Sequence, residues 1–171
     1  AMSDKNDTTL RGNYALMNHA DILISIHTNA DSSGTAEGCQ TYVWYPNTVD
    51  GKQQWVREDK WPENYADEML PPNTYNLALK MKNAMFAVYK NYTGSGKSSI
   101  IGSNLGELRE IRNAWYNKGT PDNTKAIPAV HIEMGFHDNK YNARLLRSIP
   151  FRESTSEELA QAVIEFFDEK N

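Results

Sequence analysis

The sequence predicts an α/β domain in which a mostly parallel sheet is flanked by helices. Two short apolar runs with strand character, at residues 22–26 and 129–132, lead into polar residues, His27 and Glu133. Between these two runs, a long segment that begins at residue 73 or 74 repeats apolar residues at helical spacing. Strands that alternate with helices along a chain are typical of an α/β layer architecture.

The remaining elements follow from the same kinds of pattern. In chain order, the sequence predicts a helix over 8–19, strands over 22–26 and 39–45, a helix over 73–93, strands over 105–111 and 127–134, a helix over 142–148 and a closing helix from 154. Residues 47–72 show no clear periodicity, which is typical of a lid, a binding loop or a disordered segment. Ser154 and Glu157 have the spacing of a capping box and mark the predicted start of the closing helix.

Three of the predicted helices carry an apolar face of the kind that packs against a core. These faces are formed by Leu10, Tyr14 and Met17 in the first helix, by Leu77, Met81, Met85, Val88 and Tyr92 in the long helix, and by Leu159, Val163 and Phe166 in the closing helix.

Length and composition narrow the possible functions. A chain of 171 residues has the length of one domain, so we expect residues 1–171 to form a single domain and a monomer. The net charge of −4 gives no electrostatic reason to expect nucleic-acid binding. No apolar run approaches about 18 residues, so no membrane span is predicted. Cys39 is the only cysteine, which excludes an internal disulfide and a cysteine-rich metal site.

His27 and Glu133 are the main candidate functional residues, because open α/β sheets bind ligands at the carboxyl ends of their strands. An imidazole and a carboxylate can together hold a zinc ion and act on its bound water. Structural alternatives remain for both residues. His27 could be hydrogen-bonded to backbone at a strand end, and Glu133 could form a salt bridge with Arg109 or Arg112.

Two further histidines lie near Glu133 in the sequence. His131 precedes Glu133 by two residues, so both side chains point to the same face of the predicted strand. His131 could line a cleft or pack in the core, and packing is favoured. His137 follows the strand, and a position on the surface is favoured over one in the cleft.

Two motifs of this chain resemble those of the zinc-dependent N-acetylmuramoyl-L-alanine amidases of the amidase-3 type. That family carries a strand ending in Ser-Ile-His-x-Asn, which residues 25–29 match, and a later segment Pro-Ala-x-x-x-Glu-x-Gly-Phe-x-x-Asn, which residues 128–139 match. The order and the strand context of the motifs also agree. The resemblance extends from about residue 10 to the C-terminus, with a poor match over residues 46–73.

The resemblance implies a function as well as an amidase-3-like fold. It implies hydrolysis of the amide bond between N-acetylmuramoyl groups and L-alanine in peptidoglycan, with zinc as the cofactor and peptidoglycan as the partner. His27 would bind the metal, Glu133 would be the catalytic base, and Asn29 and Asn139 would contact the substrate. Such a hydrolase would act in the cell wall, in the extracellular or periplasmic space, although no signal peptide is visible.

The chain departs from the family pattern at its start. Family members begin with a strand and a Gly-His-Gly-rich turn that supplies a first zinc-binding histidine, and a glutamate ligand follows on the next helix. Neither feature is present in this sequence. We therefore expect the first strand, first helix and second strand of the family to be absent, together with two of three protein zinc ligands. Two alternatives follow: a zinc peptidase, and a non-catalytic domain that binds peptidoglycan or a partner.

Overall fold

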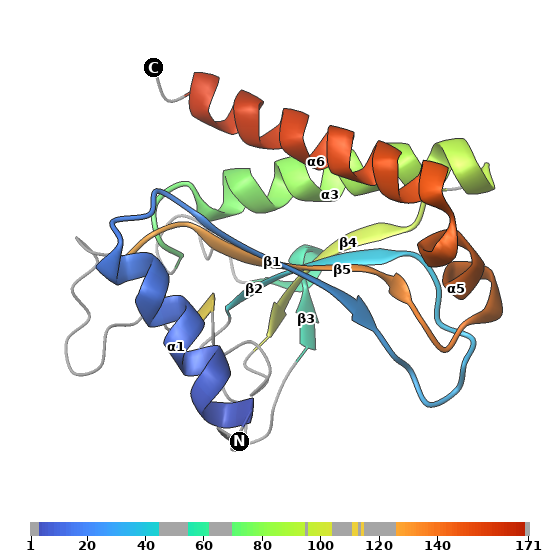
Figure 1. The fold of residues 1–171 in the computed structure, drawn as a ribbon, viewed down its shortest axis with the longest axis horizontal. Helices are drawn as coiled ribbons and strands as arrows, with labels where there is room; N and C mark the ends of the chain where they lie inside the picture. Colours follow the sequence, from blue (N-terminus) through green and yellow to red (C-terminus); the bar gives the residue numbers. More distant parts are fainter. Residues whose placement is uncertain are drawn as a thin grey trace. The chain divides into compact units, whose positions relative to one another are not determined.

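The chain combines one β-sheet with helices, which confirms the predicted α/β class (Figure 1). The computed structural model describes residues 4–44, 55–61, 70–94, 96–103, 111–112, 114 and 126–169. In chain order, its elements are α1 (Asp4–Met17), β1 (Leu23–Asn29), β2 (Cys39–Trp44), β3 (Trp55–Arg57), the 3₁₀ turn η1 (Glu58–Lys60), α3 (Thr74–Thr93), β4 (Ser98–Ser103), β5 (Ala129–Phe136), α5 (Lys140–Arg147) and α6 (Ile149–Asp168).

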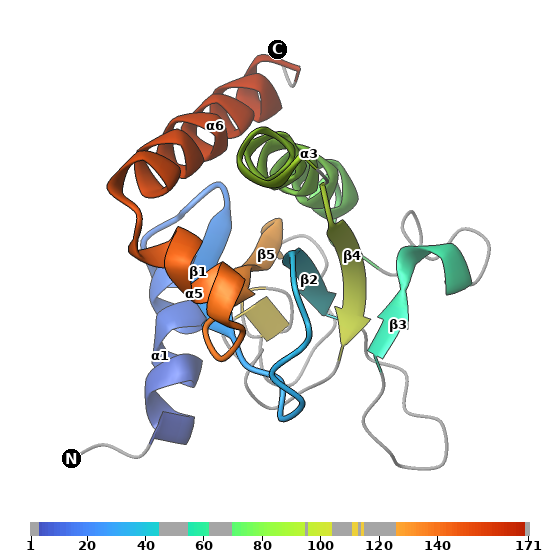
Figure 2. The same ribbon diagram turned by 90° about the vertical axis from the view of Figure 1, so that its right-hand side faces the viewer.

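The described strands form one sheet in the order β1-β5-β2-β4-β3. β3 runs antiparallel to β4, with Trp55 opposite Ser103 and Arg57 opposite Ile101 (Figure 2). β1 and β5 run parallel, because backbone hydrogen bonds join Leu23 to Pro128, just before β5, and Asn29 to His137, just after it. The sheet therefore contains both parallel and antiparallel pairs.

The chain divides into two compact units. Unit 1 consists of Ala1–Ser25, Tyr42–Tyr75 and Ile101–His131, and unit 2 consists of Ile26–Thr41, Asn76–Ile100 and Ile132–Asn171. Four strands, β1, β2, β4 and β5, contribute residues to both units. The expectation of a single domain over residues 1–171 stays a prediction.

Unit 1 has an apolar core of its own. Its buried cluster consists of Tyr42, Ile101, Ile111, Ala114 and Ala129, and Leu23, Trp44 and Ile127 pack against it. The guanidinium carbon of Arg112 lies 5.5 Å from the centroid of the Trp44 ring, within the range of a cation–π interaction. Arg112 therefore helps to cover the edge of this core.

Helix α1 in unit 1 differs from the prediction. It begins at Asp4 rather than near residue 8. Its predicted apolar face is exposed to solvent, with Leu10 at 49%, Tyr14 at 70% and Met17 at 79% exposure. Gly12 and Ala15 are buried instead. These two positions are three residues apart and share one helix face, and their small side chains let the helix pack closely.

Unit 2 contains the antiparallel helix pair α3 and α6, which lie side by side (Figures 1 and 2). Just beyond α6, Glu169 accepts hydrogen bonds from Asn76 at 3.2 Å and from Lys80 at 2.7 Å, both near the start of α3. At the other end of the pair, the ring centroids of Tyr92 and Phe151 are 5.4 Å apart. The start of each helix therefore contacts the end of the other.

The predicted apolar faces of α3 and α6 supply much of the core of unit 2, which confirms these faces. The buried members are Leu77, Met81, Met85 and Val88 in α3, and Leu159 and Phe166 in α6. Tyr92 is 38% exposed, and Val163 is half-buried. Within the part of the chain that the structure describes, no helix has both the length and the apolar character needed to cross a membrane.

The start of α6 was predicted too late. The helix begins at Ile149, and Pro150 occupies its first turn. Proline is favoured there because its fixed φ suits a helix and its missing N–H is not needed. Ser154 lies inside the helix, where its hydroxyl is 3.2 Å from the hydroxyl of Tyr92. The capping-box spacing of Ser154 and Glu157 therefore does not mark a helix start.

The sequence patterns missed two strands. β4 contains only two consecutive aliphatic residues, Ile100 and Ile101, which is a weak strand signal. The strand predicted over 105–111 falls largely outside the described residues, and Ile111, its last residue, is helical. β3 is a three-residue strand inside the segment 47–72, and it forms by pairing with β4. Such short strands depend on a partner and leave little periodicity in the sequence.

Candidate functional site

His27 and Glu133 lie on the neighbouring strands β1 and β5. The N–H of Leu23 donates to the carbonyl of Pro128 over 2.9 Å, which pairs Leu23 with Ala129 in a parallel ladder. A regular ladder keeps this register, so His27 lies opposite Glu133. Opposite residues of a parallel pair project to the same face of the sheet. The imidazole and the carboxylate therefore share one face toward the carboxyl ends of their strands.

β5 contains one extra residue after Glu133. In the regular register, the N–H of Phe136 would donate to the carbonyl of Asn29. The N–H of His137 makes this bond instead, at 2.8 Å. The N–H of Phe136 donates to Oδ1 of Asn142 in α5, at 3.1 Å. The strand therefore bulges between Glu133 and His137, and α5 satisfies the backbone group that the ladder leaves out.

Gly135 lies in this bulge and has a φ of 152°, a value that favours glycine. A Cβ at this position would overlap with the hydroxyl oxygen of Tyr89. That hydroxyl donates to the carbonyl of Met134 over 2.8 Å, and burial raises the pKa of Tyr89. Helix α3 therefore holds the backbone directly after Glu133. These contacts give a physical reason for the Glu-x-Gly part of the motif.

His27 and Glu133 differ in their exposure to solvent. His27 is exposed, whereas Glu133 is partly buried and its Oε2 atom is shielded from solvent. An accessible imidazole can bind a ligand from solution, and a partly buried carboxylate can accept or deliver a proton in a restricted environment. The pair is therefore suited to metal binding or to proton transfer.

The loops that follow β1 and β5 are held together by hydrogen bonds. Oδ2 of Asp138 accepts a bond from the N–H of Asp31 at 2.7 Å. The Asp31 carboxylate accepts bonds from the hydroxyl and the N–H of Ser33, and these bonds lower the pKa of Asp31. Oγ1 of Thr28 lies 3.3 Å from Nδ1 of His137. These contacts connect the two loops next to the strand ends that carry His27 and Glu133.

Asn29 and Asn139, the predicted substrate-binding residues, both make structural hydrogen bonds. The Asn29 amide donates to Oε1 of Gln40 at 2.9 Å, and its oxygen accepts from the N–H of Ala30 at 2.8 Å. Asn139 is 5% exposed and caps α5, because its oxygen accepts from two N–H groups of the first turn at 2.9 and 3.2 Å. Substrate contact by either residue stays a prediction.

The structure decides between the alternatives for His131 and His137. His131 is 3% exposed and belongs to unit 1, where its ring centroid lies 6.0 Å from that of Tyr42 at an interplanar angle of 84°. This edge-to-face contact confirms the prediction that His131 packs in the core. His137 is exposed, which confirms the predicted surface position.

Sequence reasoning did not identify Tyr89 and Asn142, which hold the chain after Glu133. Tyr89 follows Val88 in the sequence of α3 but was not part of the predicted apolar face. Asn142 was placed at the start of a helix, but it lies inside α5 and is 3% exposed. A polar residue on the core-facing side of a predicted helix is the sequence signal that could have identified Asn142.

Comparison with protein families decides which family the chain belongs to. The model of the Amidase_3 family, described as N-acetylmuramoyl-L-alanine amidase, matches residues 1–165. The chain belongs to this family. Comparison with curated proteins gave no match.

Solved amidase structures share the fold of this Amidase_3 chain. N-acetylmuramoyl-L-alanine amidase from Clostridium difficile 630 is 22% identical, with a TM-score of 0.62 and coverage of 96% of this chain and 67% of that one. Ami1 from Mycobacterium smegmatis is 16% identical, with a TM-score of 0.61 and coverage of 95% and 61%. The catalytic domain of CwlV from Bacillus (Paenibacillus) polymyxa var. colistinus is 18% identical, with a TM-score of 0.57 and coverage of 94% and 65%. The chain thus has an amidase-3 fold and spans about two thirds or less of each of these structures.

The described residues of this Amidase_3 chain do not form a complete zinc site. Among them, no group of three or more His, Cys, Asp or Glu side chains could hold a metal ion. Zinc is normally bound by three or four protein ligands, so His27 and Glu133 are too few. A complete site would need ligands from outside the described residues.

Proposed function

We propose that this Amidase_3 chain is a peptidoglycan amidase that acts on the bond between N-acetylmuramoyl groups and L-alanine. The observation that supports the proposal is the parallel pairing of β1 with β5, the neighbouring strands that carry His27 and Glu133. The match of the Amidase_3 family to residues 1–165 supports the choice of reaction. Peptidoglycan as substrate would place the protein in the cell wall, in the extracellular or periplasmic space.

Glu133 is the proposed general base. Its carboxylate would take a proton from the attacking water and pass it to the nitrogen of the departing amine, so one group serves both steps. The bulge at Gly135 and the Tyr89 bond to Met134 would keep the Glu133 backbone in place during these transfers. Asn29 and Asn139 would contact the substrate from the loops that follow β1 and β5.

His27 is the proposed zinc ligand. A neutral imidazole is a common nitrogen ligand of zinc, and zinc supplies Lewis-acid activation of water and of the substrate carbonyl when it is bound. Since the described residues lack a complete ligand set, His27 would need further ligands from elsewhere. The proposal therefore assigns His27 one role, which is to bind the metal together with further ligands.

A second candidate function is binding of peptidoglycan, or of a partner, without cleavage. The observation that favours it is the absence of a metal-binding group of three or more suitable side chains among the described residues. Sedimentation with purified cell-wall sacculi would detect binding, and zinc analysis would show whether the purified chain retains metal. Binding without zinc and without cleavage would favour this second function.

Two variants test the division of roles in a form of the enzyme in which the missing zinc ligands are supplied and which cuts peptidoglycan. Glu133→Gln keeps the shape of the side chain but removes the base, so turnover should fall by roughly 10²–10⁴-fold, the usual contribution of acid–base catalysis. His27→Ala removes a ligand, so zinc itself should be lost. Release of stem peptides measures turnover, and elemental analysis measures bound zinc.

Thermal unfolding of both variants serves as the control, because each is expected to keep the fold. Near-normal turnover of Glu133→Gln would contradict the role of Glu133 as the base. Loss of zinc from Glu133→Gln, with zinc retained in His27→Ala, would show that the two roles are assigned the wrong way round.

A further inference from the structure

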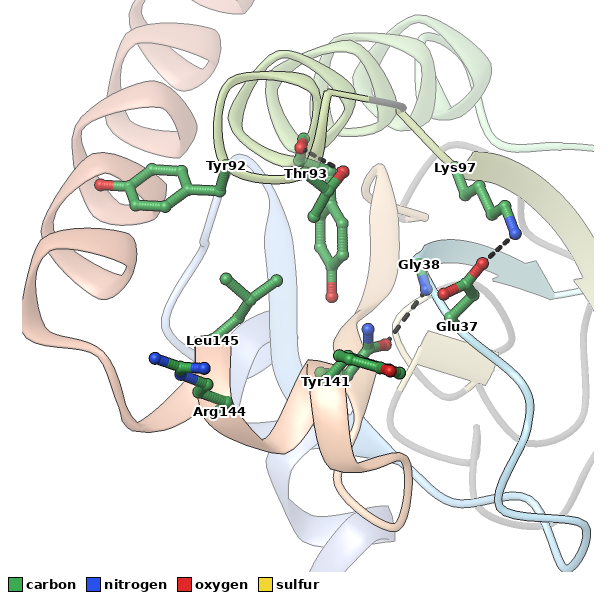
Figure 3. Close-up of a pocket in the computed structure, with 10 residues that line it drawn as sticks. Glu37, Gly38, Tyr92, Thr93, Lys97, Tyr141, Arg144 and Leu145 are labelled. Atoms are coloured by element: carbon green, nitrogen blue, oxygen red, sulfur yellow. Dashed lines mark hydrogen bonds and ion pairs between the residues drawn. The ribbon is translucent and has the colours of Figure 1, made fainter.

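A cavity of about 500 Å³ lies between the end of α3 and the first turns of α5, within unit 2 (Figure 3). It is lined by Glu37, Gly38, Tyr89, Tyr92, Thr93, Lys97, Tyr141, Asn142, Arg144 and Leu145. Neither His27 nor Glu133 belongs to this lining. Its volume lies in the range of about 300–1,000 Å³ that is typical of small-molecule sites. The cavity is therefore large enough for a ligand that the proposed amidase chemistry does not account for.

Asn142 is a buried residue in the lining of this cavity, and its side-chain amide can supply a hydrogen-bond donor. Asn142 is 3% exposed, and its Oδ1 accepts bonds from the N–H groups of Gly38 and Phe136, each at 3.1 Å. Two N–H donors at one atom identify it as the oxygen, so the NH₂ group occupies the other position. Within the described residues, no hydrogen-bond acceptor meets this NH₂ group. A donor of this kind in the wall of a cavity favours a ligand that brings an acceptor oxygen.

The charges around the cavity favour an anionic ligand. Figure 3 shows Lys97 and Glu37 as an ion pair on one side, where their charges offset each other. Arg144 lies on the other side, is exposed, and has no ion-pair partner among the residues that the structure describes. The lining thus carries two cationic groups and one anionic group. An amide donor together with an uncompensated guanidinium suits a carboxylate.

The rest of the lining is mainly apolar. The rings of Tyr89 and Tyr92 pack against Phe151 and form stable walls, and Leu145 adds an aliphatic surface. Such walls can accommodate the carbon skeleton of a small molecule while the polar groups fix its orientation.

We propose that this cavity binds a small dicarboxylate ligand of about dipeptide size, with one carboxylate at the Asn142 NH₂ group and the other at Arg144 on the opposite side. The ligand could be a short acidic peptide or a free organic acid, since both supply the same recognised group. The proposed ligand contacts involve neither His27 nor Glu133, although Tyr89 and Asn142 of the lining also hold the backbone after Glu133.

Titration of the ¹⁵N-labelled full chain with three probes tests the proposal. The probes are alanyl-glutamate, its neutral analogue N-acetyl-alanyl-glutamine amide, and succinate. Alanyl-glutamate should shift the side-chain resonances of Asn142 and Arg144 with saturation, and the neutral analogue should bind at least about tenfold more weakly. Binding of succinate as tight as that of the dipeptide would identify an organic-acid site, and weaker binding would identify a peptide site.

Matched variants make the test specific. Asn142→Asp keeps oxygens for the N–H groups of Gly38 and Phe136 but replaces the donor by a carboxylate, so alanyl-glutamate should bind at least about tenfold more weakly. Arg144→Gln should weaken binding of alanyl-glutamate but not of the neutral analogue. Arg147→Gln is the control, because Arg147 is an exposed cation on the same helix that does not line the cavity.

Several outcomes would overturn the proposal. These are the absence of a saturable shift with alanyl-glutamate and succinate, equal binding of the charged and neutral dipeptides, and equal effects of Arg144→Gln and Arg147→Gln. If Asn142→Asp does not fold, the comparison of the two arginine variants still decides the question. Because the readout is binding, failure here would leave the proposed amidase function unaffected.

Discussion

The backbone conformation at Gly135 shows how one residue shapes the candidate site. Glu133 is followed by a bulge in which Tyr89 donates to the Met134 carbonyl and Asn142 accepts from the Phe136 N–H. Gly135 lets the backbone pass close to the Tyr89 hydroxyl, where no larger residue fits. The position of Glu133 therefore depends on a glycine that carries no chemistry itself.

Replacement of Gly135 by alanine should destabilise the fold. A methyl group at a φ of 152° is strained, and it would also overlap with the Tyr89 hydroxyl oxygen. We expect a loss of about 1–3 kcal/mol in the free energy of unfolding, measured by urea denaturation. Gly94→Ala is the matched control, because Gly94 has a φ of 73° but no heavy atom within 4 Å of an added Cβ. An equal loss in both variants would show that contact with Tyr89 contributes nothing.

His27 and Glu133 could be identified from the sequence because their signal is local. Each follows a short apolar run, and each lies in a motif that can be recognised from adjacent residues. Tyr89 and Asn142 could not be identified in this way. Their contacts with Met134 and Phe136 depend on how α3 and α5 pack against β5, which no local pattern encodes.

At the scale of elements, helix α5 is defined by its N-terminal cap. Asn139 accepts hydrogen bonds from two N–H groups of the first turn of α5. Asn139 is buried, and in the sequence it lies between β5 and α5. The cap fixes the point at which the chain leaves the loop after β5 and begins the helix that carries Asn142. The last asparagine of the motif thus has a structural role beside its predicted contact with substrate.

Substitution of Asn139 separates these two roles. Asn139→Ala should lower the free energy of unfolding by about 0.5–2 kcal/mol, because the cap is lost, and Asn139→Asp should keep most of the stability. Chemical denaturation of both variants measures the cap. If Asn139→Ala leaves the stability unchanged but weakens binding to cell-wall sacculi, the cap would be unimportant and substrate contact would be the main role.

Elements with strong periodicity could be predicted, and elements defined by their partners could not. Helix α3 spans Thr74–Thr93, close to its predicted bounds, because its apolar residues recur over five turns and Gly94 ends it. The start of α6 was missed because Pro150 fixes it, whereas the capping-box pattern four residues later is coincidental. The pairing of β3 with β4 brings together segments about 45 residues apart, which no short window can detect.

At the scale of the molecule, the α/β class and the amidase-3 fold could be predicted from two motifs about 100 residues apart. The adjacency of β1 and β5 then explains why these motifs belong together, since the sheet brings the histidine of one beside the glutamate of the other. The division into two units and the exposed apolar face of α1 could not be predicted, because both depend on long-range contacts.

The chain of 171 residues is expected to show weak or no release of stem peptides from peptidoglycan, even with added zinc. The physical reason is the incomplete metal site among the described residues, since a single histidine binds zinc too weakly to retain it through purification. Elemental analysis of the purified chain should find substoichiometric zinc, and added zinc should bind without raising turnover to the level of an active amidase measured in parallel. His27→Ala is the control for metal binding at the candidate site. Robust turnover that a chelator abolishes would contradict this expectation, because it would mean that residues outside the described ranges complete the site.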